Sequence, residues 1–191
     1  MTSALLVGTP NSGKSLLFNR LTGLHQRVAN FPGITVDVAQ GALRGRPEVT
    51  LVDFPGTYSL LPISGEERIA SDGFMHALAD PSLGAVLCIV DATRLEKSLH
   101  FCLQILRECA RTGTPVLILA NMIDVLERNG LAFDASGLAR RLGVPVLPVS
   151  ARTGRGMDEL REALGERRDE AVPQARWAGR SDQQLAGDAH A

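Results

Sequence analysis

The chain has 191 residues, of which 45% are hydrophobic and 21% are charged, and its formal net charge at pH 7 is -1. This length and composition predict one globular domain with room for a short tail, because a chain of this size can bury a full core. The nearly neutral charge gives no electrostatic case for an anionic membrane surface as the main partner, and we expect no nucleic-acid partner. No apolar run reaches the roughly 18–20 residues that a membrane helix needs, so this chain alone is expected to be soluble.

The side chains that could form disulfides or bind iron show no spacing typical of such sites. Cys88, Cys102 and Cys109 have apolar neighbours and no Cys-x-x-Cys spacing, which predicts buried reduced thiols. The four histidines are scattered, and Glu159 and Glu162 share a helix face with arginines, which favours a solvated surface. The sequence therefore indicates neither a disulfide framework nor a zinc site, and we assign no iron site.

Apolar segments of strand length alternate with segments of helical spacing along the chain. We expect strands at residues 4–7, 36–43, 48–53, 84–90, 115–120 and 144–149, and helices at residues 16–21, 66–78, 95–111, 134–142 and 157–168. An extended loop is predicted over residues 24–35, and an antiparallel hairpin at the sheet edge over residues 36–53. This order predicts a three-layer α/β/α fold with a mostly parallel sheet of six to seven strands. We divide the chain into one domain, residues 1–168, and a flexible tail or truncated start of a further domain, residues 169–191.

Residues 8–15 read GTPNSGKS and lie between an apolar strand and a helix, which is the context of a phosphate-binding loop. Gly8 and Gly13 let the backbone approach a ligand closely, and the start of the helix adds the positive end of its dipole. Lys14 can reach the β- and γ-phosphates, and the hydroxyl of Ser15 can bind Mg²⁺. The predicted phosphate-binding residues are Gly8, Thr9, Pro10, Asn11, Ser12, Gly13, Lys14, Ser15 and Leu16. A nucleoside triphosphate is therefore the expected ligand.

Two further motifs lie where the γ-phosphate and its metal ion would be. Thr35, in the loop before the second strand, could complete the Mg²⁺ shell beside Ser15, although a hydrogen-bonded loop hydroxyl would explain a lone threonine equally well. Asp53 ends the third strand, where a carboxylate can hold Mg²⁺, usually through water. The N–H of Gly56 can donate to an oxygen of the γ-phosphate. Ser15, Thr35 and Asp53 are thus the predicted ligands of Mg²⁺.

The next two motifs distinguish guanine from adenine. Residues 121–124 (NMID) close the fifth strand, and the carboxylate of Asp124 offers two adjacent acceptors for the N1–H and N2–H₂ donors of guanine. Leaving those donors buried and unmatched would cost about 1–3 kcal/mol each. Ala151, after the sixth strand, could donate its N–H to guanine O6. The predicted guanine-binding residues are Asn121, Met122, Asp124, Ser150, Ala151 and Arg152. Because ligands of open α/β sheets bind at the carboxyl ends of strands, the motifs together predict a P-loop GTPase domain with GTP as substrate.

The chain resembles the cytosolic G domain of the ferrous iron transport protein B (FeoB) family over nearly all of residues 3–164. The resemblance is carried by the phosphate loop, residues 28–36 (VANFPGITV), 53–60 (DFPGTYSL), 64–70 (SGEERIA) and 90–96 (VDATRLE). It implies a TrmE-Era-Era-like P-loop GTPase fold. Asn-Met-x-Asp is the usual guanine motif of this family, so Met122 in place of lysine does not count against guanine.

The resemblance also implies how the phosphate site works. An asparagine at the position of Asn11 helps to hold K⁺ against the phosphates, where the cation supplies the charge of an arginine finger; alternatively, Asn11 only shapes the loop. Thr57 stands where many GTPases have the glutamine that orients water, so we expect slow intrinsic hydrolysis that K⁺ stimulates. The predicted catalytic residues are Lys14, Asn11, Thr35 and Gly56. The expected cofactors are Mg²⁺ and K⁺.

For function, the resemblance implies a GTP-hydrolysing regulatory domain of a bacterial Fe²⁺ transporter at the cytoplasmic face of the inner membrane. Its second switch, from Thr57 to about Glu67, would relay the nucleotide state to helical and membrane transport regions of the full-length protein. A nucleotide-dependent homo-oligomer is a further expected partner. Two alternatives stay open: a soluble Era-like GTPase of ribosome assembly, and a nucleotide-sensing module with negligible turnover. The sequence lacks a basic RNA-binding appendage, which favours the transporter.

Overall fold

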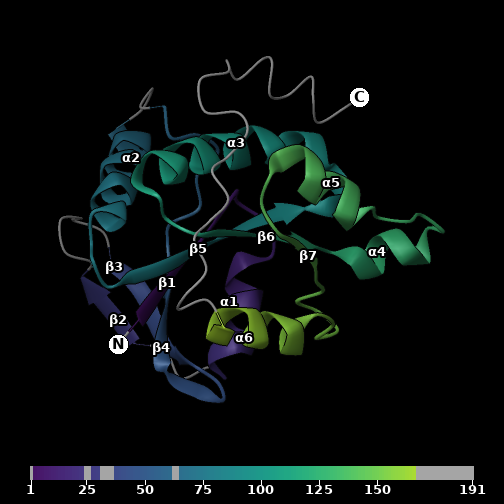
Figure 1. Cartoon of the computed structure of the whole chain (residues 1–191), viewed down its shortest axis with the longest axis horizontal. Helices are drawn as coiled ribbons and strands as arrows, with labels where there is room; N and C mark the ends of the chain where they lie inside the picture. Colours follow the sequence, from purple (N-terminus) through teal and green to yellow (C-terminus); the bar gives the residue numbers. More distant parts are fainter. Residues whose placement is uncertain (1, 24–26, 31–36, 62–64, 167–191) are drawn as a thin grey trace.

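The computed structural model describes residues 2–23, 27–30, 37–61 and 65–166. These residues form one sheet of seven strands with helices on both faces (Figure 1). The strands are β1 (Thr2–Gly8), β2 (Arg27–Asn30), β3 (Asp37–Leu43), β4 (Arg46–Asp53), β5 (Leu83–Asp91), β6 (Val116–Asn121) and β7 (Val146–Pro148). The helices are α1 (Lys14–Thr22), α2 (Gly65–Leu78), α3 (Leu95–Thr112), α4 (Ile123–Arg128), α5 (Ala135–Leu142) and α6 (Met157–Glu166), with a 3₁₀ turn η1 (Ala92–Arg94). The predicted three-layer α/β/α fold is confirmed.

The strands lie in the order β2-β3-β4-β1-β5-β6-β7. The central strand β1 pairs in parallel with β4 and β5, and the parallel pairing continues from β5 through β6 to β7. At the other edge, β3 runs antiparallel to both β2 and β4. The predicted mostly parallel sheet with an antiparallel edge hairpin is therefore confirmed. Because the parallel strands point the same way, the segments that follow β1, β4, β6 and β7 emerge at one edge of the sheet.

The segment predicted as an extended loop, residues 24–35, contains the edge strand β2, so that prediction was wrong for part of its length. The strand pairs with residues 37–40 of β3 in antiparallel register. The apolar Val28 of this strand is 71% exposed. Backbone pairing with β3 defines this strand. The rest of that segment lies outside the described residues.

Two apolar cores separate the sheet from its helices. One lies on the face covered by α2, α3 and α5, and the other on the face covered by α1 and α6 (Figure 1). Alternate residues of β5 contribute to the two cores: Val86, Cys88 and Val90 pack in the first, and Leu87 and Ile89 pack in the second. A strand covered on both faces reads as a continuous apolar run, which explains why β5 and β6 could be predicted from the sequence.

The three cysteines of the chain are buried, unpaired thiols in the first core, which confirms the prediction for them. A hydrogen bond with Cys102, together with burial, raises the pKa of the Cys88 thiol. Burial also raises the pKa of Cys109.

Most predicted elements agree with the structure to within a few residues, but α4 was not predicted and β7 is shorter than residues 144–149. Pro145 directly precedes β7 and has no N–H to donate to the sheet, which limits the start of the strand. The helix α6 is described as far as Glu166, and the predicted tail lies outside the described residues. Within the described part of the chain, no helix combines the length and apolar character that spanning a bilayer would require.

Candidate functional site

The phosphate loop joins the carboxyl end of β1 to the start of α1. The N–H of Ser12 donates to the carbonyl of Thr9 at 3.2 Å, and the N–H of Leu17 donates to the carbonyl of Gly13 at 3.0 Å as the helix begins. Gly13 has a φ of +86°, and a Cβ on it would collide with the side-chain amide of Asn121. Only glycine meets both conditions without strain. The loop therefore turns tightly over the amino end of α1, where helix N–H groups are available to an anion.

Asn11 and Met122 have positive φ values, of 65° and 69°, and both belong to predicted site motifs. Residues other than glycine seldom adopt this conformation, although asparagine does so more often than most. In the phosphate loop, the strained Asn11 is exposed while the next residue, Ser12, is only 1% exposed. The loop thus presents Asn11 at its outer surface, and such strain is commonly found at functional sites.

The end of β4 lies beside the phosphate loop, because Asp53 pairs in register with Leu6 of β1. Lys14 Nζ donates to Asp53 Oδ1, and the two side chains are only 11% and 13% exposed. Gly56 also approaches the loop, since a Cβ on it would lie 3.5 Å from the backbone nitrogen of Pro10. The structure therefore brings together the predicted phosphate lysine, the predicted metal carboxylate and the predicted γ-phosphate donor.

Ser15 and Asp53 supply the kind of ligand that Mg²⁺ prefers, a hydroxyl oxygen and a carboxylate oxygen. Ser15 follows Lys14 in the first turn of α1, and Lys14 contacts Asp53, so both candidate ligands are neighbours of this lysine, one in sequence and one in space. These residues fit a Mg²⁺ ion, whereas Thr35, the third predicted ligand, lies outside the described residues. Across the residues that are described, no three His, Cys, Asp or Glu side chains are grouped as ligands of one metal ion.

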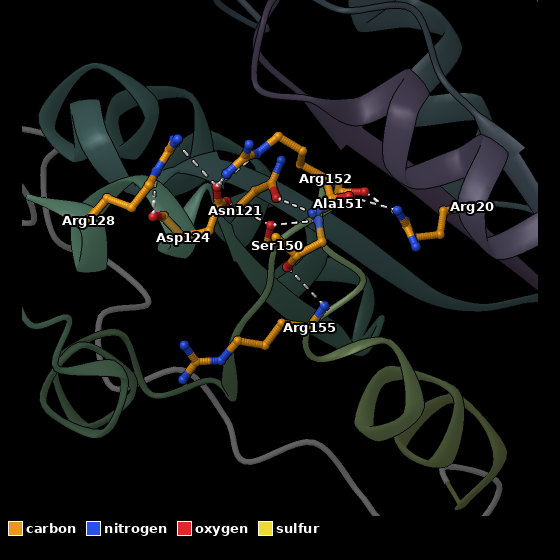
Figure 2. Close-up of polar contacts among 9 residues, drawn as sticks. Arg20, Asn121, Asp124, Arg128, Ser150, Ala151, Arg152 and Arg155 are labelled. Carbon is orange, nitrogen blue, oxygen red and sulfur yellow. Dashed lines mark hydrogen bonds and ion pairs between the residues drawn. The ribbon is translucent and has the colours of Figure 1, made fainter.

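Asn121, at the carboxyl end of β6, connects the phosphate loop to the loop after β7. Figure 2 shows Asn121 beside Ala151 of that second loop. The Asn121 side chain is 2% exposed, with Nδ2 donating to the carbonyl of Ser12 at 2.8 Å and Oδ1 accepting the N–H of Ala151 at 2.9 Å. The sequence motif named Asn121 as a guanine-binding residue but did not indicate this positioning role. The predicted bond from Ala151 to guanine O6 would have to share or replace the bond to Asn121, and it stays a prediction.

Asp124 lies in the first turn of α4, and its carboxylate accepts from two directions (Figure 2). Ser150 Oγ donates to Asp124 Oδ1 at 2.7 Å, while Arg152 donates to Asp124 Oδ2 from Nε at 2.9 Å and from Nη2 at 2.5 Å. Arg128 contributes a longer ion pair, with Nη2 at 3.7 Å from Oδ2. The Ser150 hydroxyl, followed by the Arg152 guanidinium, holds the pKa of Asp124 below its ordinary value, so this group is a carboxylate at neutral pH.

The loop after β7 is held in place by an arginine that the sequence analysis missed. Arg20, on α1, donates from Nε to the carbonyl of Ala151 and from Nη2 to the carbonyl of Arg152, both at 2.7 Å. Within the loop, the N–H of Gly154 donates to the carbonyl of Ser150 at 2.8 Å. The helix that begins in the phosphate loop therefore also positions the loop of the predicted base site. A polar residue on α1 carried no sequence signal of this contact.

The segment after Asp53 is anchored to α3. Gln104 is 5% exposed, and its Oε1 accepts the N–H of Leu60 at 2.7 Å and the hydroxyl of Ser59 at 3.3 Å. Thr57 is buried, and its hydroxyl donates to the carbonyl of Ser59 at 2.9 Å. Between these anchored residues, Tyr58 is 62% exposed. The part of the predicted second switch at residues 62–64 lies outside the described residues.

Comparisons with known proteins assign this arrangement to a family. A family profile described as Ferrous iron transport protein B matches residues 2–164. The Fe(2+) transporter FeoB of Salmonella typhimurium strain LT2 is 39% identical over 160 residues, which cover 83% of this chain and 20% of that protein. The same protein of Escherichia coli strain K12 gives the same identity and coverage. The chain thus spans about a fifth of the length of these relatives.

Solved structures of one relative have the same fold. A variant of S. thermophilus NFeoB bound to GDP has a TM-score of 0.74 and 36% identity, covering 93% of this chain and 64% of that chain. A second variant, bound to GDP·AlF4⁻, has a TM-score of 0.70 and 40% identity, covering 85% of this chain and 61% of that chain. The sequence, the fold and the profile agree, and the chain belongs to the ferrous iron transport protein B (FeoB) family.

Proposed function

We propose that this chain binds and hydrolyses GTP, and that it is the regulatory domain of a bacterial Fe²⁺ transporter. The observation that carries the proposal is the link between two sites: Asn121 contacts the phosphate loop, and Asp124 presents a carboxylate three residues later. A ligand that spans both sites needs a phosphate chain and paired N–H donors, which a guanine nucleotide has. Related S. thermophilus NFeoB structures bound to GDP, GMPPNP and GDP·AlF4⁻ support this ligand.

At the phosphate end, Lys14 and the N–H groups of the loop would bind the β- and γ-phosphates. Lys14 would exchange its bond with Asp53 for the phosphates, which leaves the carboxylate available to a metal shell. Ser15, Thr35 and Asp53 would hold Mg²⁺, which supplies positive charge to the phosphate oxygens when bound. Gly56, which lies against the loop, would donate its N–H to the γ-phosphate.

Hydrolysis is proposed to be slow in the absence of K⁺. The hydroxyl of Thr57 is buried and donates to the carbonyl of Ser59, so it is not directed at a water molecule beside the phosphates. Asn11 is exposed on the phosphate loop, and its side-chain oxygen is suited to a hard cation. K⁺ held there would add positive charge where the leaving phosphate becomes more negative.

The transport role concerns the whole protein, of which this chain is a fraction. The relatives at 39% identity are Fe(2+) transporters, which supports a place for this chain on the cytoplasmic face of the bacterial inner membrane. Tyr58 and Leu61 are 62% and 54% exposed, next to the segment that Gln104 anchors to α3. We propose that this segment changes with the nucleotide and acts on helical and membrane regions of the full-length protein. A nucleotide-dependent homo-oligomer is part of the same proposal.

The family match favours this function over an Era-like GTPase of ribosome assembly. The remaining alternative, a nucleotide sensor with negligible turnover, makes a different prediction for phosphate release. Single-turnover release of phosphate from GTP in KCl and in NaCl distinguishes the two. A sensor would release no phosphate in either salt, whereas the proposed enzyme releases phosphate faster in KCl.

Guanine recognition is tested by Asp124→Asn with GDP and xanthosine diphosphate (XDP). Asparagine presents one donor and one acceptor, which suit the N1–H and O2 of xanthine and oppose one guanine donor. A mismatch that costs about 1–3 kcal/mol corresponds to a loss of GDP affinity of roughly 5- to 150-fold, with a gain for XDP. Titration of the chain with each diphosphate measures both. Equal GDP affinity in the wild type and the variant would refute the assignment of Asp124.

A further inference from the structure

We propose that Arg152 competes with guanine for Asp124 and thereby weakens nucleotide binding. This inference rests on the proposed function, because it takes Asp124 as the base-recognition carboxylate. Sequence analysis placed Arg152 among the guanine-binding residues. The structure gives it a contact that a bound guanine would have to replace.

The competition follows from the number of lone pairs on one oxygen. Arg152 donates to Asp124 Oδ2 from both Nε and Nη2, at 2.9 and 2.5 Å. A carboxylate oxygen accepts about two hydrogen bonds, so these two bonds fill Oδ2. Guanine offers the same chemistry as a guanidinium, a pair of adjacent N–H donors, and needs one acceptor on each oxygen. Guanine and Arg152 therefore cannot both be fully bonded to Asp124.

Ser150 does not compete in the same way. Its hydroxyl donates a single bond of 2.7 Å to Asp124 Oδ1, which leaves that oxygen one further acceptor site. Arg128 is also no direct rival, because its Nη2 lies 3.7 Å from Oδ2, beyond hydrogen-bonding distance. Of these three neighbours, only Arg152 makes bonds to Asp124 that guanine would have to replace.

The side chain of Arg152 can leave without disturbing the loop. Its guanidinium is on a side chain that is 58% exposed, whereas its carbonyl is fixed by Arg20 Nη2 at 2.7 Å. Rotation of the side chain alone would release Asp124 and keep the backbone that positions Ser150 and Ala151. Because the arginine partner is 58% exposed, although Asp124 is only 12% exposed, we take the value of a surface ion pair, which corresponds to about a 1.4- to 5-fold change in affinity.

The test compares Arg152→Met with Arg155→Met. Methionine keeps an apolar stem but has no N–H donors. Arg155 provides a matched control, because it lies on the same loop, is 51% exposed and pairs with Glu127 instead of Asp124. Isothermal titration with GDP and Mg²⁺ should show about 1.4- to 5-fold tighter binding for Arg152→Met than for Arg155→Met. Equal or weaker binding by Arg152→Met would overturn the proposal.

Repeating the Arg152→Met substitution in the Asp124→Asn variant shows whether its effect on affinity depends on Asp124. Asp124→Asn removes the carboxylate, so adding Arg152→Met to it should leave the affinity for XDP unchanged. If Arg152→Met tightened XDP binding in the Asp124→Asn background as much as it tightens GDP binding in the wild type, the proposal would be overturned, because Arg152 would then act through another group. The proposed function would be refuted by a different result, namely a GDP affinity that is the same in Asp124→Asn and in the wild type. Circular dichroism of each variant, compared with the wild type, checks that the fold is retained.

Discussion

Replacing Asn121 by alanine should uncouple the phosphate loop from the loop after β7. The side chain makes two buried hydrogen bonds, from Nδ2 to the carbonyl of Ser12 at 2.8 Å and from the N–H of Ala151 to Oδ1 at 2.9 Å. Alanine makes neither bond and leaves both backbone groups without a partner. We therefore expect a loss of stability together with a loss of nucleotide affinity.

The size of the effect follows from the two backbone groups that lose their partner, the carbonyl of Ser12 and the N–H of Ala151. A buried backbone group that loses its partner costs about 1–3 kcal/mol, and some of this is recovered if water reaches the site. Two such groups give an expected loss of about 2–4 kcal/mol in the free energy of unfolding. For a domain of this size, each kcal/mol lowers the melting temperature by about 2–4 °C, so the expected decrease is about 4–16 °C.

Differential scanning calorimetry of Asn121→Ala, with and without GDP, measures both effects. Asn129→Ala is the matched control, because Asn129 is an exposed asparagine directly after α4. The control should melt within about 2 °C of the wild type, as expected for a surface substitution. If Asn121→Ala also melts that close to the wild type and binds GDP equally well, Asn121 does not connect the two loops.

Three further predictions concern other residues of the site. Gly13→Ala should lower the free energy of unfolding by about 1–3 kcal/mol and abolish GDP binding, because the φ of +86° and the contact with Asn121 leave no room for a Cβ. Denaturant unfolding measures the loss of stability, and titration with GDP measures the loss of binding. Asn11→Ala should slow phosphate release in KCl to its rate in NaCl while GDP affinity is retained, and a loss of GDP affinity would identify Asn11 as a structural residue. The lowered pKa of Asp124 stabilises the fold above the ordinary value of 3.8, and this stability should disappear as the pH falls through the lower folded pKa. Ser150→Ala should therefore raise the pKa of Asp124 as measured by NMR, and an unchanged pKa would exclude the hydroxyl as its main cause.

The parts of the site that could be predicted are those encoded by adjacent residues. The phosphate loop is one stretch of eight residues, and its glycines, lysine and serine act through local backbone geometry. Asp53 and Asp124 were predicted because the carboxyl ends of parallel strands meet at one edge of the sheet. The strands β5 and β6 were predicted because both their faces are buried.

The contacts that were missed join residues far apart in the sequence. Asn121 bonds to Ser12 across 109 residues, and Arg20 bonds to Ala151 across 131 residues. Side-chain type gives no signal of such a partner, because a polar residue at the same position could equally face solvent. The strand β2 was missed for a similar reason: it is defined by backbone pairing with β3, and its apolar residue Val28 is exposed.

The three cysteines in the first core can report when that core opens. Cys88, Cys102 and Cys109 are buried, and the raised pKa values of Cys88 and Cys109 keep those thiols protonated and unreactive. Alkylation by iodoacetamide should therefore follow the rate at which the core opens, without any added label. A new cysteine in Tyr58→Cys, at a position that is 62% exposed, would be labelled selectively in the folded protein. A fluorophore attached there would follow the segment between β4 and α2 as nucleotide is added.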